Sequence, residues 1–85
     1  MQIIEIVVDD KNYQIEWALS EYFDELKGMK FNLNEVAADQ IIVLDNLSET
    51  AKILLSAVAG AVIQHLIDNN CDVDSIFKKG YFIVK

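Results

Sequence analysis

Four oxygen-bearing side chains near the C-terminus have a spacing that could bind a divalent cation. They alternate along the stretch DNNCDVDSIFKK, as Asp68, Asn70, Asp72 and Asp74. Alternating oxygen ligands open a calcium loop, but Val73 stands where that loop needs a turning glycine and Lys79 where it needs a bidentate glutamate. We therefore predict a solvated acidic turn without metal ligands. A small-ligand or divalent-metal-binding module that uses the Asp68–Asp74 loop is kept as the alternative function.

The single cysteine and the single histidine are the candidates for nucleophilic catalysis. Cys71 and His65 are six positions apart across a predicted helix end, and no third group is evident that would orient the imidazole. One cysteine forms no internal disulfide, and one Cys with one His is too few for a zinc site. We predict no catalytic residues, no enzyme activity and no cofactor. The lack of a possible internal disulfide favours a reducing, cytoplasmic location.

Acidic side chains are the third group with a possible function. We predict an acidic, partner-binding face formed by Glu21, Asp24, Glu25, Glu35, Asp39 and Asp45. One explanation is that a small domain with an apolar core needs net charge for solubility. The other is that a surface of one sign directs the chain to a basic protein, including the nucleic-acid groove of another protein.

The overall charge argues against nucleic acid as a direct ligand. The chain has 14 acidic residues, seven lysines and no arginine, for a net charge of −7. Duplex binding depends on cations placed against phosphates, and base recognition relies on arginine. An anionic membrane surface is disfavoured for the same electrostatic reason.

Length and composition predict one domain, spanning residues 1–85, and a need for additional burial. A chain of 85 residues leaves much of its surface exposed on folding. Its 53% hydrophobic content is nevertheless slightly high. A partner chain that covers apolar surface would explain both observations, and a homodimer is the simplest candidate.

The N-terminal quarter predicts a β-hairpin over residues 2–19. β-Branched residues fill IIEIVV, the polar turn DDKN follows, and Tyr13, Ile15 and Trp17 then alternate with polar residues. A short helix is expected near residues 21–27, with Ser20 as its N-cap and Gly28 in the left-handed closing position. MKFNLN returns to a strand pattern, residues 35–44 fit a helical turn followed by a short strand, and GYFIVK is a final strand that could pair with the hairpin.

A long helix is predicted over about residues 49–68. Ser48 is the N-cap, and Asn69 or Asn70 supplies a left-handed stop. At 100° per residue the polar positions form one narrow stripe, consisting of Lys52, Ser56, Gly60, Gln64 and Asp68. The rest of the circumference is apolar, so a sheet on one side leaves the other side to be covered.

Two soluble arrangements could cover the second side of this helix. Either the 21–27 and 35–44 segments wrap it within the chain, or the same helix of a second chain packs on it; the residues predicted for this core or dimer helix are Ala57, Gly60, Ala61 and Gln64. A membrane span is not predicted, because Gln64, His65 and Asp68 interrupt the apolar run.

Together these features predict an α+β fold with a mostly antiparallel sheet packed on one long helix. The function expected is that of a small, acidic, non-catalytic protein–protein interaction module. A concrete version is a phage- or plasmid-type inhibitor that uses its acidic face to occlude a basic, nucleic-acid-binding protein.

Overall fold

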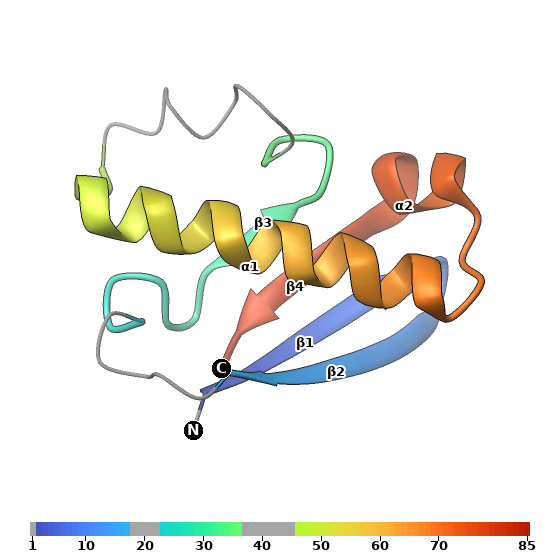
Figure 1. Cartoon of the computed structure of the whole chain (residues 1–85), viewed down its shortest axis with the longest axis horizontal. Helices are drawn as coiled ribbons and strands as arrows, with labels where there is room; N and C mark the ends of the chain where they lie inside the picture. Colours follow the sequence, from blue (N-terminus) through green and yellow to red (C-terminus); the bar gives the residue numbers. More distant parts are fainter. Residues whose placement is uncertain (1, 18–22, 37–45) are drawn as a thin grey trace.

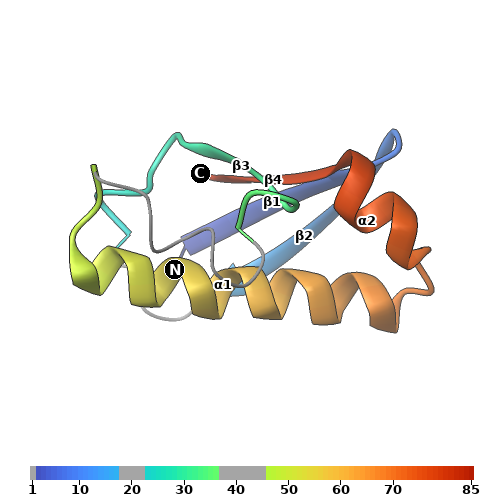
Figure 2. The ribbon, with the colours of Figure 1, turned by 90° about the horizontal axis from the view of Figure 1, so that it is seen from above.

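The chain forms a four-stranded antiparallel sheet with a long helix lying across one face (Figures 1 and 2). The structure is a computed structural model that describes residues 2–17, 23–36 and 46–85. The elements are β1 Gln2–Val8, β2 Lys11–Trp17, β3 Lys30–Asn32, α1 Glu49–Asp68, α2 Val73–Lys79 and β4 Gly80–Val84, and the sheet order is β2-β1-β4-β3. The predicted α+β class is confirmed.

The β1–β2 hairpin turns at two residues. Val8 pairs with Lys11, and the intervening Asp9 and Asp10 have φ values of 49° and 69°. Two successive positive φ angles are typical of a type I′ turn, whose twist matches that of antiparallel strands. The predicted turn DDKN was therefore too long, because Lys11 and Asn12 already belong to β2.

Alternation along β1 separates the core from the outer face of the sheet. Ile4, Ile6 and Val8 are buried, and the facing side chains of β2, which include Tyr13 and Ile15, are half-buried against the same core. Gln2 is the one buried polar residue among those described; its amide donates to the backbone carbonyls of Lys85 and Ile3. This satisfies a polar group that would be unfavourable to bury alone.

The final strand lies in the middle of the sheet. β4 pairs with β1 on one side and with β3 on the other, so the predicted pairing with the N-terminal hairpin is confirmed. Its first residue must be glycine, because a Cβ on Gly80 would lie 2.7 Å from Leu33 Cδ1 and closer still to the Ile76 carbonyl oxygen. Because the chain can pass this closely at Gly80, β4 follows α2 without a connecting loop.

The predicted short helix near 21–27 is wrong over its described part. Residues 18–22 lie outside the described residues, and Phe23–Gly28 forms hydrogen-bonded turns. Both Leu26 and Lys27 donate to the Phe23 carbonyl, but the Gly28 amide donates to Val84 of β4 at 2.7 Å. The Gly28 amide, which would bond within a longer helix, thus bonds to the sheet instead. Gly28 does have the expected left-handed conformation, with φ +79°.

Helix α1 has the predicted bounds and is continuous through Gly60. The Ser48 side chain accepts a hydrogen bond from the Ala51 amide at 3.1 Å. At the other end, Asn70 has φ 63° and donates to the Ile67 carbonyl, while the Cys71 amide donates to Leu66. These two bonds form a Schellman motif, which ends a helix by satisfying its last carbonyls.

Helix α2 occupies the stretch that was predicted to be an acidic turn. Asp72 is its N-cap, and its carboxylate accepts from the Ser75 amide at 3.1 Å. The helix is short and has one fully buried residue, Ile76. With so small an apolar face it gives little helical periodicity, which explains why it was missed.

The core lies between the sheet and α1 and includes residues from the connecting segments. Phe23, Leu26, Leu33, Val36 and Leu47 are all buried there. Of the 35–44 segment, Glu35 and Val36 lie in a turn and a bend after β3, and 37–44 lies outside the described residues. The described part of this segment thus adds Val36 to the same core as α1.

Candidate interaction surface

One side of α1 faces the sheet, and its residues are buried in the core. Its buried residues are Ala51, Leu55, Val58, Ala59, Val62 and Leu66. They recur every three or four positions, so they share one side of the helix. Figure 2 shows α1 as a separate layer on one face of the sheet, and the burial of these six residues places them on its inner side.

The opposite side of α1 carries a second row of residues, which is exposed, uncharged and apolar except for Gln64. We call it the outer stripe; it consists of Ile53, Ala57, Gly60, Gln64 and Ile67. Ile53 is 72% exposed and Ile67 is 45% exposed. The successive spacings of four, three, four and three residues are those of a helix seam that meets another helix. Within the described ranges 2–17, 23–36 and 46–85, this side of α1 is therefore not enclosed as the core side is.

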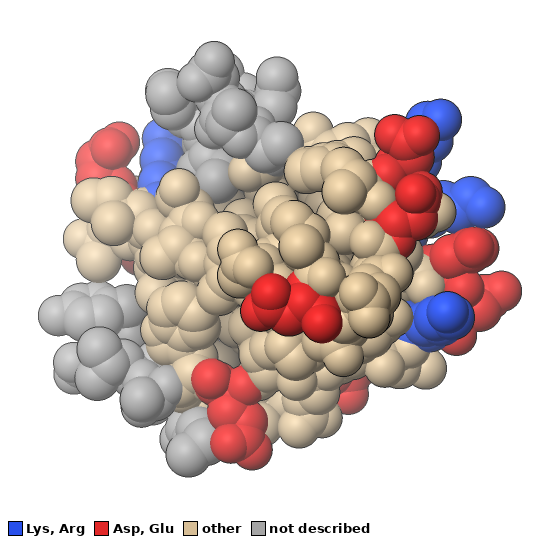
Figure 3. Space-filling model, turned by 45° about the vertical axis from the view of Figure 1, so that its right-hand side comes forward, with Lys and Arg blue, Asp and Glu red and all other residues tan. Residues whose placement is uncertain are grey.

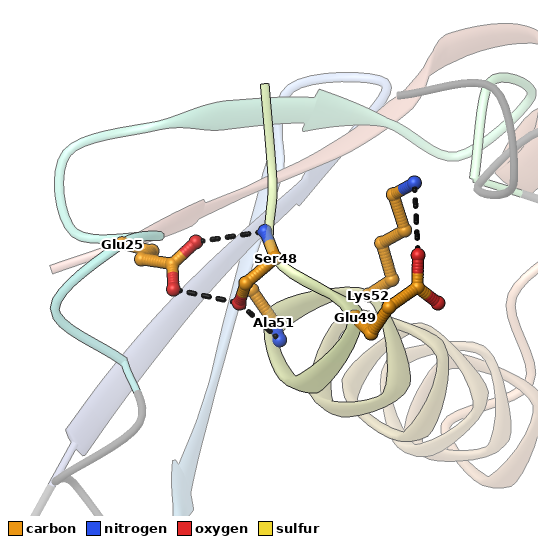
Figure 4. Close-up of polar contacts among 5 residues, drawn as sticks. All are labelled: Glu25, Ser48, Glu49, Ala51 and Lys52. Carbon is orange, nitrogen blue, oxygen red and sulfur yellow. Dashed lines mark hydrogen bonds and ion pairs between the residues drawn. The ribbon is translucent and has the colours of Figure 1, made fainter. Parts of the chain in front are cut away.

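Charge is confined to the two ends of the outer stripe. Near the N-terminal end, Lys52 forms an ion pair with Glu49 at 3.6 Å (Figure 4). At the C-terminal end, Gln64 donates to Asp68 at 2.9 Å. Between Ile53 and Ile67 α1 has no Asp, Glu, Lys or Arg. Desolvating this stripe would therefore leave no bare charge at its centre.

The structure brings three of the four predicted helix residues together. Ala57, Gly60 and Gln64 are all exposed in the outer stripe, while Ala61 is half-buried on the flank of α1. Gly60 has open space around it, since a Cβ at that position would meet no atom within 4 Å. The small residues at 57 and 60 leave a low point between the two isoleucines.

Glu25, predicted to lie on an acidic face, is engaged by the start of α1. Its carboxylate accepts from the Ser48 amide at 3.0 Å and from the Ser48 hydroxyl at 2.7 Å (Figure 4). These bonds, the backbone one first, hold the pKa of Glu25 below its ordinary value of 4.5, and burial opposes them. Glu25 thus holds Ser48 in place, and Ser48 in turn caps the first turn of α1.

The other predicted acidic residues do not form one patch in the described structure. Asp24 pairs with Lys27 at 3.4 Å, and Glu35 accepts from Asn32 at 3.3 Å after β3. Glu21, Asp39 and Asp45 lie outside the described residues. Figure 3 shows acidic side chains spread over the surface, with acids and lysines mixed on one side. Partner binding by these residues stays a prediction.

Tyr13 joins the predicted Cys71 and His65 pair, a contact that sequence spacing did not indicate. Its hydroxyl lies 2.9 Å from Cys71 Sγ, and its ring meets the His65 ring edge-on with centroids 6.1 Å apart. The hydrogen bond to Cys71 chiefly raises the pKa of Tyr13 above its ordinary value of 10.0. Because the thiol bonds to Tyr13 rather than to the imidazole, this cluster attaches β2 to the end of α1 and does not assemble a Cys–His nucleophile.

Two of the four alternating oxygen-bearing side chains, those of Asp68 and Asp72, have other partners. Asp68 accepts from Gln64, and Asp72 caps α2. Among the residues that the structure describes, no group of three or more His, Cys, Asp or Glu side chains could hold a metal ion. A hollow of about 280 Å³ does lie between this loop and the hairpin, lined in part by Asp9, Asn70 and Asp72.

By length and composition alone, α1 is apolar enough to cross a membrane, and 33% of its most apolar 18-residue window is buried. Core helices of soluble proteins meet the same criterion, and α1 has its N-cap bound by Glu25 and one full side packed on the sheet.

Comparison with protein-family models, with curated proteins and with solved structures finds no match for this chain.

Proposed function

We propose that this protein is a small, non-catalytic interaction module that binds other proteins through the outer stripe of α1 and through its acidic surface. The observation that carries the proposal is the exposure of Ile53 and Ile67 on one uncharged helix side. An apolar row backed by a packed core is preorganised, so a partner can bury it with little loss of conformational freedom.

The net charge supports the second half of the proposal. A chain with 14 acidic and seven basic residues attracts basic protein surfaces and repels nucleic acid. A protein that covers the nucleic-acid groove of a basic partner would use this charge for approach and an apolar contact for affinity. This is the inhibitor version of the function, and it requires no catalytic group.

Capture of partners from the native host, followed by binding of the purified partner, tests the proposal. Ile53→Glu should abolish or strongly weaken binding, because it places a charge in the contact. Val73→Glu is the matched control: Val73 is 54% exposed on α2, so the same change in charge falls outside the outer stripe. Equal loss of binding in both variants would contradict a role for the stripe.

Salt dependence tests the acidic part separately. Partner binding should weaken as ionic strength rises, and Asp24→Lys should weaken it further by removing an exposed negative charge. Glu25 is unsuitable for this test because its substitution would disturb the start of α1. Binding that is insensitive to both salt and Asp24→Lys would rule out the acidic surface as the recognition element.

A further inference from the structure

We propose that the outer stripe of α1 is covered by the same stripe of a second copy of this chain, with the two helices antiparallel and crossing at Gly60. This inference rests on the proposed function and names the occupant of the same surface. In the resulting symmetric dimer the second copy is the protein that the outer stripe binds, and the acidic surface of each copy remains for a heterologous partner.

The two isoleucines of the stripe are placed symmetrically about one residue. Ile53 lies seven residues before Gly60, and Ile67 lies seven residues after it. Seven residues are almost two full helical turns, so all three residues lie within about 20° of one line along the helix. A twofold axis at Gly60 therefore sets Ile53 of each copy level with Ile67 of the other. An isologous interface needs this arrangement, in which one patch complements itself.

The small residues fall where two helices would come closest. Gly60 is exposed with open space above it, and Ala57 lies one turn away on the same side. Helix axes can approach to about 8 Å when side chains at the crossing are small. The large side chains at positions 53 and 67 are then at both ends of the contact, where they fill the widening gap between the helices.

Charge selects the antiparallel over the parallel orientation. Antiparallel pairing about Gly60 brings Asp68 of one copy to the same height as Lys52 of the other, on the opposite flank of the contact and near the positive N-terminal end of its α1. Parallel pairing would instead set Glu49 level with Glu49 and Asp68 level with Asp68. With a net charge of −7 per chain, separating like charges in this way matters.

The face that carries α1 is large enough for a stable dimer. Figure 1 looks onto this face along the shortest axis of the molecule. The two longer extents of the molecule, which lie in the plane of that view, are 32 and 27 Å. A standard interface buries about 800 Å² on each partner, so the contact has to extend from the outer stripe onto the rest of this face. α1 has 20 residues and a length of about 30 Å, so it runs along the whole face.

The β2 edge of the sheet is a poorer place for the second copy. β2 is an outer strand, but it carries exposed charges at Lys11 and Glu16. Charged residues on an edge strand oppose pairing with another chain. The outer stripe has no such protection along its central part.

Cross-linking of single-cysteine variants tests both the occupant and the orientation. In a Cys71→Ser background, Ile53→Cys and Ile67→Cys are made separately and treated with a short bismaleimide, alone and mixed. Both positions are exposed, so folding should be retained. We expect dimer in the mixture and loss of it in either variant alone. Lys78→Cys, exposed on α2, is the control and should give none alone or in mixtures.

Other outcomes overturn the inference in distinguishable ways. Dimer from Ile53→Cys alone would show a parallel pair, and no dimer in any sample would remove the second copy. In that last case, partner capture that still depends on Ile53 would leave the proposed function standing with a different protein on the stripe. Binding of the chain to neutral lipid vesicles, abolished by Ile53→Glu, would assign the stripe to a membrane instead.

Discussion

Individual residues in this chain connect segments that are far apart in sequence, and Glu25 is the clearest example. It lies 23 residues before Ser48 and yet accepts two hydrogen bonds from it. The sequence predicted Ser48 as an N-cap and Asn69 or Asn70 as a stop, because caps depend on nearby residues. It could not predict that Glu25 supports the cap, since the contact exists only after the connecting segments fold.

Replacing Glu25 with Gln should lower the free energy of unfolding at neutral pH. It should also make that free energy less dependent on pH in the acidic range. The folded-state pKa of Glu25 is lowered, so its contribution is complete above its ordinary pKa of 4.5 and is lost as pH falls through the lower folded value. Urea unfolding from pH 7 down to pH 3 measures this effect. Asp24→Asn is the control, and an identical pH profile for the two variants would contradict the assignment.

The hairpin turn offers a prediction of the opposite sign. Asp10 has φ 69°, which glycine adopts with less strain. Asp10→Gly should therefore raise the free energy of unfolding by roughly 0.5–1 kcal/mol, whereas Asp10→Val should lower it. Thermal or urea unfolding of the two variants checks the turn type; a stabilised valine variant would be incompatible with a type I′ turn.

Elements were predictable where their periodicity was long. α1 and the hairpin were found because 20 and 14 residues of clear pattern specify them. α2 was missed because seven residues with one fully buried side chain hardly differ from a turn. The expected helix near 21–27 failed because Gly28 bonds to β4, a tertiary contact that overrides local preference.

Two glycine substitutions should have opposite effects on stability. Gly60→Ala should stabilise the isolated chain by about 0.8–1 kcal/mol, because Gly60 is interior to α1 with open space around it. Gly80→Ala should destabilise the fold, since its Cβ would clash with the backbone of Ile76. Urea unfolding at low protein concentration, where a dimer dissociates, measures both. Similar changes for the two variants would contradict the packing of α2 on β4.

The N-cap gives a further test at this scale. Ser48→Ala should lower stability by about 1 kcal/mol through loss of the cap, and the Glu25 carboxylate would keep one donor instead of two. Ser56→Ala, an exposed serine in the middle of α1, is the control and should change stability little. Equal effects would show that Ser48 does not act as a cap.

At the scale of the whole molecule, the sequence predicted too much apolar helix surface for a single chain, and the structure shows where the excess lies. From the sequence one can predict that α1 is apolar around most of its circumference. The sequence alone does not indicate which of these residues the sheet covers. That choice depends on how α1 is rotated over β1 and β4. The rotation leaves Ile53 and Ile67 outside and Gly60 between them.

Light scattering across a range of protein concentrations tests the central claim most directly. The chain mass is 9.6 kDa. We predict a mass of twice that value for the wild-type protein and for Val73→Glu, falling to the single-chain mass in Ile53→Glu because the charge disrupts the outer stripe. A wild-type mass of 9.6 kDa at every concentration, unchanged by Ile53→Glu, would contradict the account.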